Sequence, residues 1–229
     1  MNPAPRFDAL ARPYRWLELF SFGPLLMRAR TFFLDQLVCN SVTMRRALVL
    51  GDGDGRFTAL LLKALPGLEV DAVDASPPML DALVKSSGLA AARLRTDCAD
   101  VRGFEPPRPP YDLFVTHFFL DCLTTEEVAA LALRLRATSR PGALWIVSEF
   151  AVPGGLYGRV IARPLVWLLY RVFAVLTGLR VRALPRHAEA LAGAGFALAA
   201  RRSWLGGLLT SELWRFEEVK ENRGFPEVK

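Results

Sequence analysis

From Ala47 to Phe150 the chain alternates short apolar runs with longer segments that carry apolar residues at helical spacing. Short apolar runs between turn residues are typical of buried strands, and apolar positions three or four residues apart are typical of helices. A strand–helix alternation of this kind predicts βαβ units, in which helices cover a largely parallel sheet. The pattern therefore predicts one domain of the α/β class.

Five strands and three helices are expected in this part of the chain. The strands are expected within residues 46–52, 68–76, 91–100, 111–121 and 143–150. The helices are expected within residues 55–67, 76–84 and 124–142. Thr124 and Glu127 have the spacing of a capping box, and Pro141-Gly142 is expected to end the last of these helices.

The pattern changes after the fifth expected strand. An apolar insertion dotted with arginines, residues 151–184, precedes a short expected helix within 185–196. Two further strands on either side of Gly206-Gly207 are expected to form an antiparallel pair at the sheet edge. The expected division of the chain is a helical cap over 1–45, a main domain over 46–218 and a polar tail over 219–229.

A glycine-rich segment, "ALVLGDGDGRF" at residues 47–57, directly follows the first expected strand. The turn between a first strand and its helix is where open α/β sheets bind ligands, because backbone amides and the helix N-terminus are exposed there. A dinucleotide loop of the Gly-x-Gly-x-x-Gly type would need a glycine at position 56, which is Arg56. The segment therefore argues against an NAD-binding loop. It could also be an ordinary turn that binds no ligand.

The spacing Gly51-x-Gly53-x-Gly55 resembles the S-adenosylmethionine loop of class I methyltransferases. Four later segments resemble the following motifs of that family, in order: "VDAVDASPPML", "RTDCAD", "YDLFVTHFFLDCLT" and "RPGALWIVSEF". The resemblance implies S-adenosylmethionine as cofactor and a three-layer, Rossmann-like fold with a mostly parallel seven-stranded sheet whose last strand is antiparallel. "FDALARPYRW", "VDASPPML" and the "AGF" region look most like the quinone-biosynthesis and related small-molecule branch.

The resemblance also implies which residues hold the cofactor. Asp74, at the end of the second strand, would accept hydrogen bonds from both ribose hydroxyls, unless it is an ordinary surface carboxylate. Asp97 would accept a hydrogen bond from the adenine amino group, and Asp100 is the alternative for this role. The expected set lies in the glycine loop and at the ends of three strands: Gly51, Asp52, Gly53, Asp54, Gly55, Asp74, Ala75, Met79, Asp97, Cys98 and Thr116.

One position departs from the family pattern. The family usually has an acidic residue two places before the first glycine, where it helps to hold the amino group of the ligand, and here that position is Val49. Asp52 and Asp54 are expected to replace it, because a carboxylate favours both the ammonium and the sulfonium of the cofactor.

Methyl transfer needs a base only if the acceptor must lose a proton, and His117 and Asp121 are the candidate catalytic residues. The alternative for His117 is a core residue of the fourth strand. The alternative for Asp121 is a residue that precedes or caps the helix at Thr124. His187 follows Pro185 at the start of a helix and is expected at the surface.

The net charge of +6 allows anionic partners of several kinds. The late arginines are spread through apolar sequence, which suits a lipid-facing surface better than a DNA groove. The segment 160–179 is apolar but is interrupted by Arg163, Pro164 and Arg171, so it is not expected to span a membrane. This insertion is expected to line a pocket for a lipophilic acceptor, to contact an anionic membrane peripherally through residues 156–182, or to add core.

Cys39, Cys98 and Cys122 are odd in number and widely spaced, so neither a disulfide framework nor a metal site is expected. The N-terminus carries no uninterrupted apolar region of the kind that export signals need, and a cytoplasmic location is expected. No nucleic-acid partner is expected, because the chain has no Asn/Asp-Pro-Pro-Tyr motif and no platform of aromatic and basic residues.

The sequence therefore predicts an enzyme that transfers a methyl group from S-adenosylmethionine to a small, hydrophobic acceptor. The alternative is a degenerate methyltransferase-like protein that binds the cofactor without catalysis, which Val49 and the lack of a clear base would fit. An NAD-dependent dehydrogenase is the third alternative, and Arg56 argues against it.

Overall fold

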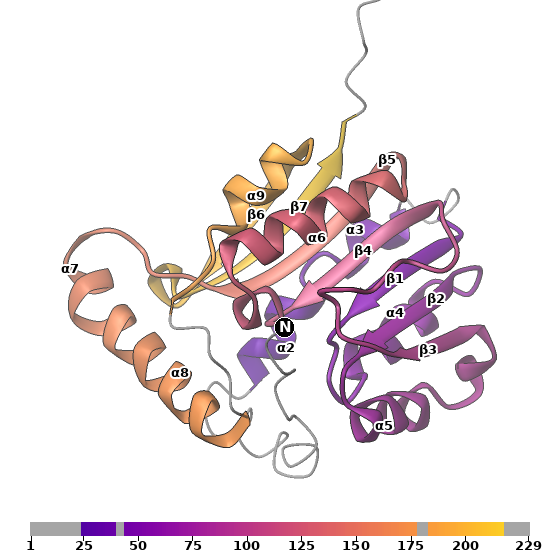
Figure 1. Cartoon of the computed structure of the whole chain (residues 1–229), viewed down its shortest axis with the longest axis horizontal. Coiled ribbons are helices and arrows are strands. Elements are labelled where there is room, and N and C mark those ends of the chain that lie inside the picture. Colours follow the sequence, from indigo (N-terminus) through magenta and orange to yellow (C-terminus); the bar gives the residue numbers. More distant parts are fainter. Residues whose placement is uncertain (1–23, 40–43, 178–182, 218–229) are drawn as a thin grey trace, which may run out of the picture.

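The computed structural model describes residues 24–39, 44–177 and 183–217, which contain seven strands. The strands are β1 Arg46–Leu50, β2 Glu69–Asp74, β3 Leu94–Cys98, β4 Tyr111–His117, β5 Ser139–Phe150, β6 Phe196–Trp204 and β7 Leu209–Phe216. They form one sheet in the order β3-β2-β1-β4-β5-β7-β6 (Figure 1). β7 is antiparallel to β5 and β6, and the other neighbours are parallel. The predicted seven-stranded α/β fold is confirmed.

Helices cover both faces of this sheet. The α-helices are α2 Pro24–Thr31, α3 Leu34–Cys39, α4 Arg56–Ala64, α5 Pro77–Ser87, α6 Thr125–Ala137, α7 Gly155–Tyr157, α8 Arg163–Thr177 and α9 His187–Gly193. Short 3₁₀ helices are η3 Gly88–Arg93, η4 Leu120–Cys122 and η6 Leu205–Gly207, and the π-helix η5 is Gly158–Ala162. In Figure 1, α6 and α9 lie in front of the sheet and α4 lies behind it.

Two apolar clusters hold these layers together. Trp145 and Phe114 of the sheet pack with α6 and α9 on one face. Val49 and Val115 pack with α3, α4 and α5 on the other. Because helices cover both faces of the sheet, the central strand β4 is buried along its whole length.

The first helix of the described chain is fixed to the last strand. Ser148 Oγ of β5 and Ser211 Oγ of β7 both donate hydrogen bonds to Ala29 O, at 3.2 and 2.8 Å. Ala29 lies in the last turn of α2, where carbonyl oxygens have no partner within the helix. The two hydroxyls therefore cap α2 and hold Arg30, which is buried, above the sheet.

The start of α6 agrees with the sequence prediction, whereas its end differs from it. Thr124 and Glu127 form the predicted capping box, with bonds of 3.2 and 2.9 Å. The helix ends at Ala137, and β5 begins at Ser139, before the expected stop at Pro141-Gly142. A register shift between β4 and β5 accommodates the proline and glycine at the start of the strand.

The insertion after β5 forms a continuous run of α7, η5 and α8. Figure 1 shows this run beside the end of the sheet, apart from the helices of the two covering layers. Among the described residues there is no helix with the length and hydrophobicity that a membrane span requires. Residues 1–23 of the expected cap, the expected tail over 219–229 and residues 178–182 of the insertion lie outside the described residues.

Candidate functional site

The predicted cofactor residues meet at one edge of the sheet. β1 and β4 are neighbours, but the chain leaves them toward opposite sides of the sheet, so their carboxyl ends flank a topological switch point. Gly51 N donates a hydrogen bond to Val73 O at 2.9 Å, and Asp74 of β2 pairs in register with Cys98 of β3. Ligands of open α/β sheets bind at such an edge.

The glycine loop adopts a backbone that favours glycine. Gly51, Gly53 and Gly55 all have positive φ angles, of 65°, 63° and 75°. A side chain at Gly51 would collide with the ring of Phe119, and one at Gly55 would collide with the backbone of Leu83. Gly51 and Gly55 are therefore required by the packing of the chain itself, in addition to their predicted role of letting a ligand approach.

Asp52 is buried in the glycine loop that precedes α4. Its Oδ2 accepts hydrogen bonds from Thr58 N at 2.9 Å and from Thr58 Oγ1 at 2.7 Å. Its Oδ1 is buried without a hydrogen-bond donor among the described residues. Burial raises the pKa of Asp52 to about 6, although Arg30 and the bonds from Thr58 lower it. Asp52 therefore changes its charge close to neutral pH.

Asp54 has a different environment from Asp52. Its carboxylate forms an ion pair with Arg56, at 2.9 Å, and its carbonyl oxygen accepts a hydrogen bond from Ser86 Oγ at 2.8 Å. Arg56 stands where a dinucleotide loop would have a glycine, and its charge balances Asp54. Of the two loop carboxylates, Asp52 is therefore the one with a buried oxygen that a cationic ligand could satisfy.

The ends of β2 and β3 carry the residues predicted to bind adenosine. Asp74 is half-buried, and its Oδ1 accepts a hydrogen bond from Ser76 N at 2.9 Å. Asp100, the alternative to Asp97, accepts hydrogen bonds from Arg102 N at 3.0 Å and from Arg102 Nη1 at 3.1 Å. Asp97 has no such ion pair among the described residues, so the geometry favours Asp97 over Asp100 for ligand contact.

The remaining predicted cofactor contacts differ in exposure. Ala75 is exposed, and its carbonyl oxygen lies 3.8 Å from Cys98 Sγ. Met79 is buried on α5. Thr116 is fully buried, and its Oγ1 accepts a hydrogen bond from Trp145 Nε1 at 3.0 Å. The side chain of Thr116 therefore belongs to the core.

His117 is a neutral histidine at the end of β4. It is only 2% exposed, and its ring packs edge-on against Phe57. Its Nδ1 lies 3.0 Å from Ser148 Oγ, which itself donates its proton to Ala29 O, so Nδ1 is the donor and Nε2 is unprotonated. Burial and Arg30 lower the pKa of His117 well below its usual value. These contacts favour a role for His117 as a core residue over a role as a catalytic base.

Asp121 and Glu149 are acidic residues that follow β4 and end β5. Glu149 Oε1 accepts hydrogen bonds from Phe119 N at 3.0 Å and from Leu120 N at 2.8 Å. Burial raises the pKa of Asp121 to about 6, and burial together with Asp121 raises the pKa of Glu149 well above its usual value. The shift favours the protonated form of Glu149, and Asp121, with a pKa of about 6, is the residue of the pair that can exchange a proton near neutral pH.

The sequence analysis missed Arg30 and Glu149. Arg30 lies in the helical segment before β1, where nothing in the sequence shows that its charge will be buried beside Asp52 and His117. Glu149 could have been found from the sequence, because it is the one acidic residue in the apolar run "ALWIVSEF". A carboxyl group in a buried strand needs hydrogen-bond donors, and here the backbone after β4 supplies them.

The residues of this edge fit S-adenosylmethionine. Carboxylates at the ends of β2 and β3 match its ribose and adenine donors, and the buried Oδ1 of Asp52 matches a cationic group. Bound there, the cofactor supplies an electrophilic methyl group. The chain's own residues would hold its adenosine, through Asp74 and Asp97, and its cationic part, through Asp52.

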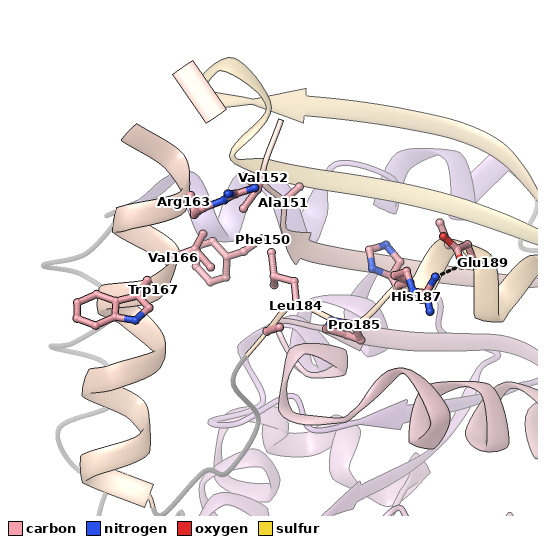
Figure 2. Close-up of a pocket in the computed structure, with 13 residues that line it drawn as sticks. Phe150, Ala151, Val152, Arg163, Val166, Trp167, Leu184, Pro185, His187 and Glu189 are labelled. Atoms are coloured by element: carbon pink, nitrogen blue, oxygen red, sulfur yellow. Dashed lines mark ion pairs between the residues drawn. The ribbon is translucent and has the colours of Figure 1, made fainter. Parts of the chain in front are cut away.

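A pocket of about 540 Å³ lies at the end of β5, as Figure 2 shows. Arg163, Val166 and Trp167 of α8 stand on one side, and His187 and Glu189 of α9 on the other (Figure 2). The lining is mostly apolar, with a few charged groups at its rim, and consists of Phe150, Ala151, Val152, Arg163, Val166, Trp167, Ala183, Leu184, Pro185, Arg186, His187, Ala188 and Glu189.

His187 differs from its expected surface position. Its side chain is only 14% exposed, and its Nε2 lies 3.2 Å from Glu212 Oε2 of β7. Glu212 also accepts a hydrogen bond from Trp214 Nε1 and pairs with Arg201. The ring of His187 is partly buried beside Glu212, because the buried carboxylate of Glu212 needs hydrogen-bond donors.

Comparison with known proteins agrees with this geometry. Residues 48–145 match the family model described as a methyltransferase domain. The N-methyltransferase NodS from Bradyrhizobium japonicum WM9, solved with S-adenosyl-L-homocysteine, has a similar structure: TM-score 0.61, 14% identity, 84% of this chain and 88% of NodS covered. No curated protein matches the chain by sequence.

Two larger methyltransferases also share the fold. An O-methyltransferase family protein from Burkholderia thailandensis has a TM-score of 0.61 and 19% identity, over 85% of this chain and 61% of that one. The mitomycin 7-O-methyltransferase MmcR has a TM-score of 0.61 and 18% identity, over 92% of this chain and 60% of MmcR. The chain thus spans less than two thirds of either protein.

The fold and the matching domain are those found in Rossmann-like methyltransferases. Residues 48–145 match a methyltransferase domain, which bears out the predictions of a methyltransferase and of S-adenosylmethionine as its cofactor.

Proposed function

We propose that the protein methylates a small, apolar acceptor that binds in the pocket between α8 and α9. The pocket itself carries this proposal, because its walls are apolar and its volume, about 540 Å³, suits a small molecule. Phe150 lines the pocket, and its ring packs 5.2 Å from the ring of Phe118, which follows His117. The pocket thus adjoins the strand ends at which the cofactor is expected.

Within this proposal the chain acts mainly by positioning. Apolar walls exclude water and orient the acceptor, and proximity and alignment supply most of the acceleration of a methyl transfer. Asp121 is the candidate base for an acceptor that must lose a proton, because its pKa of about 6 leaves it ionised at neutral pH. His117 holds Ser148 and, through it, the end of α2.

The names of similar proteins support an acceptor of this kind without fixing its identity. MmcR is named for oxygen methylation of mitomycin, and NodS is named as an N-methyltransferase. We extend the proposal to the quinone-biosynthesis and related small-molecule branch, on the sequence resemblance alone. The acceptor atom is therefore left open between oxygen, nitrogen and carbon.

The test uses S-adenosylmethionine carrying tritium in its methyl group, incubated with purified protein and fractions of an organic-solvent extract. We expect label in an apolar fraction, and we expect none with the Asp74→Ala variant. Leu184→Trp should fill the pocket and raise KM for the acceptor at least about ten-fold. Leu133→Trp is the control, because Leu133 is 54% exposed on α6, outside the pocket.

Two results would count against the proposal. Equal KM values for Leu184→Trp and Leu133→Trp would show that the acceptor does not use this pocket. Binding of S-adenosylhomocysteine without labelled product from any fraction would favour the degenerate, non-catalytic alternative.

A further inference from the structure

In the helical run α7, η5 and α8, the residues whose burial the structure describes bury only a narrow stripe. Gly158, Ala162 and Val166, four residues apart, face the rest of the chain, and Ala162 and Val166 pack with Leu208. Positions four residues apart lie on one side of a helix. The other sides of this run are therefore turned away from the domain.

Large apolar side chains occupy those outward sides. Their exposed fractions range from 52% to 74%, whereas most large apolar residues of the other described elements are buried: Leu156, Val160, Ile161, Trp167 and Leu168. Single exposed apolar residues are ordinary, but a contiguous set on one element marks an interaction surface. This outward apolar set needs an apolar partner.

The charges around this set identify the kind of partner. Between Phe150 and Glu189 the sequence has six arginines and no acidic residue. Arg159, Arg163 and Arg171 are exposed on the helical run itself, and Arg171 lies over the ring of Trp167 at 5.4 Å. A surface that is apolar and purely basic complements anionic lipid headgroups above an acyl layer. It does not complement a second copy of itself, because the arginines of two copies would repel.

We propose that the run α7–η5–α8 docks on the surface of an anionic lipid bilayer. Leu156, Val160 and Leu168 would enter the boundary between headgroups and acyl chains, and Trp167 would lie at headgroup level. The arginines would extend along the helix toward lipid phosphates. The same helix carries Val166 and Trp167 of the pocket, so an apolar acceptor could pass from the bilayer to the pocket; only this last step rests on the proposed function.

Vesicle sedimentation tests the docking independently of any catalysis. The full chain is mixed with vesicles of phosphatidylcholine alone or with about one third phosphatidylserine. We expect binding to the anionic vesicles only, weakening as salt rises from 0.1 to 0.5 M because the charges are screened. Arg159→Gln/Arg171→Gln should weaken binding about 25-fold, since each arginine near an anionic surface contributes about five-fold. Both arginines lie outside the pocket lining.

Matched controls separate this surface from overall charge and hydrophobicity. Arg95→Gln/Arg136→Gln removes the same charge from exposed positions on β3 and α6 and should bind like the unmodified chain. Val160→Ser/Leu168→Ser should weaken binding at least about ten-fold. Its control is Leu89→Ser/Leu133→Ser, two exposed leucines elsewhere. Since all these side chains are exposed, thermal unfolding should be unchanged.

Three results would overturn the proposal. One is failure of the unmodified chain to bind the anionic vesicles, and another is equal weakening by the test and control pairs. The third is a dimer in sedimentation velocity that Val160→Ser/Leu168→Ser dissociates, which would make the occupant a second copy of the chain. A chain that binds vesicles but methylates nothing would leave the docking intact and remove only the proposed function.

Discussion

The charge of Asp52 is set by the fold, because burial brings its pKa close to neutrality. Its sequence position suggested a substitute for the acid missing at Val49, and its two bonds from Thr58 and its proximity to Arg30 appear only in three dimensions. Asp54, equally plausible from the sequence, pairs with Arg56. The loop spacing could be predicted, whereas the division of roles between its two carboxylates depends on packing.

S-adenosylmethionine should bind more tightly as the pH rises through 6. Asp52 has a folded pKa of about 6, so it is mostly neutral at pH 5 and mostly ionised at pH 7. A cationic ligand favours the ionised form, so affinity should rise several-fold over this range. Calorimetric titration at pH 5, 6 and 7 measures the step, and Asp52→Asn should abolish it.

Asp121 also has a pKa of about 6, so Asp121→Asn is the control for this titration. The pH step should persist in Asp121→Asn. Its loss there, with retention in Asp52→Asn, would assign the titrating group to Asp121 instead.

Asp74→Ala should weaken S-adenosylhomocysteine binding about 100-fold. The loss corresponds to two hydrogen bonds from ribose hydroxyls to a charged acceptor, each contributing roughly 1.5 kcal/mol. Asp81→Ala on α5 removes an exposed carboxylate nearby and should leave the affinity unchanged. Equal affinities for the two variants would place the ribose elsewhere. Calorimetry of both proteins provides the comparison.

At the scale of elements, the strands and helices from β1 to α6 could be predicted because each combines a clear period with turn residues or caps. The end of α6 could not be predicted. Pro141-Gly142 lies within β5, where a register shift between β4 and β5 accommodates it, and such a shift depends on pairing across the sheet. The conformation of the loop after β4 could not be predicted from the sequence either. Its conformation depends on Glu149, which lies 30 residues away from Phe119 and binds its backbone.

Glu149→Gln should be tolerated and Glu149→Ala should not. Burial raises the pKa of Glu149 well above its usual value, which favours the uncharged form, and glutamine reproduces both that uncharged state and the accepting oxygen. Alanine would leave Phe119 N and Leu120 N without their acceptor, at a cost of about 2–4 kcal/mol. Urea unfolding at pH 7 measures both variants. Equal destabilisation by Glu149→Gln and Glu149→Ala would mean that the charge of Glu149, rather than its hydrogen bonds, supports the loop after β4.

At the scale of the whole molecule, the fold class and the order of motifs could be read from the sequence, because the parallel strands bring their carboxyl ends to one edge. The exposure of the outward face of α8 could not be read from the sequence. Its apolar residues fit both a core helix and a surface helix in the sequence, and only the position of the helix beside the sheet separates these two cases.

Ligand-induced stabilisation of the whole chain should distinguish the cofactors. S-adenosylhomocysteine at 100 times its Kd should add about 2.7 kcal/mol to the free energy of unfolding. For a chain of this size that corresponds to a rise in Tm of about 5–10 °C. NAD should give no rise, because Arg56 replaces the last glycine of a dinucleotide loop. A rise with NAD alone would contradict the cofactor assignment.

The hydroxyls that hold Ala29 join distant parts of the chain. Ser148 and Ser211 follow Ala29 by 119 and 182 residues, so both caps of α2 are present only once β7 has been synthesised. A nascent chain that ends before β7 would contain Arg30 but would lack one of the two hydroxyls that hold the end of α2 near Asp52 and His117.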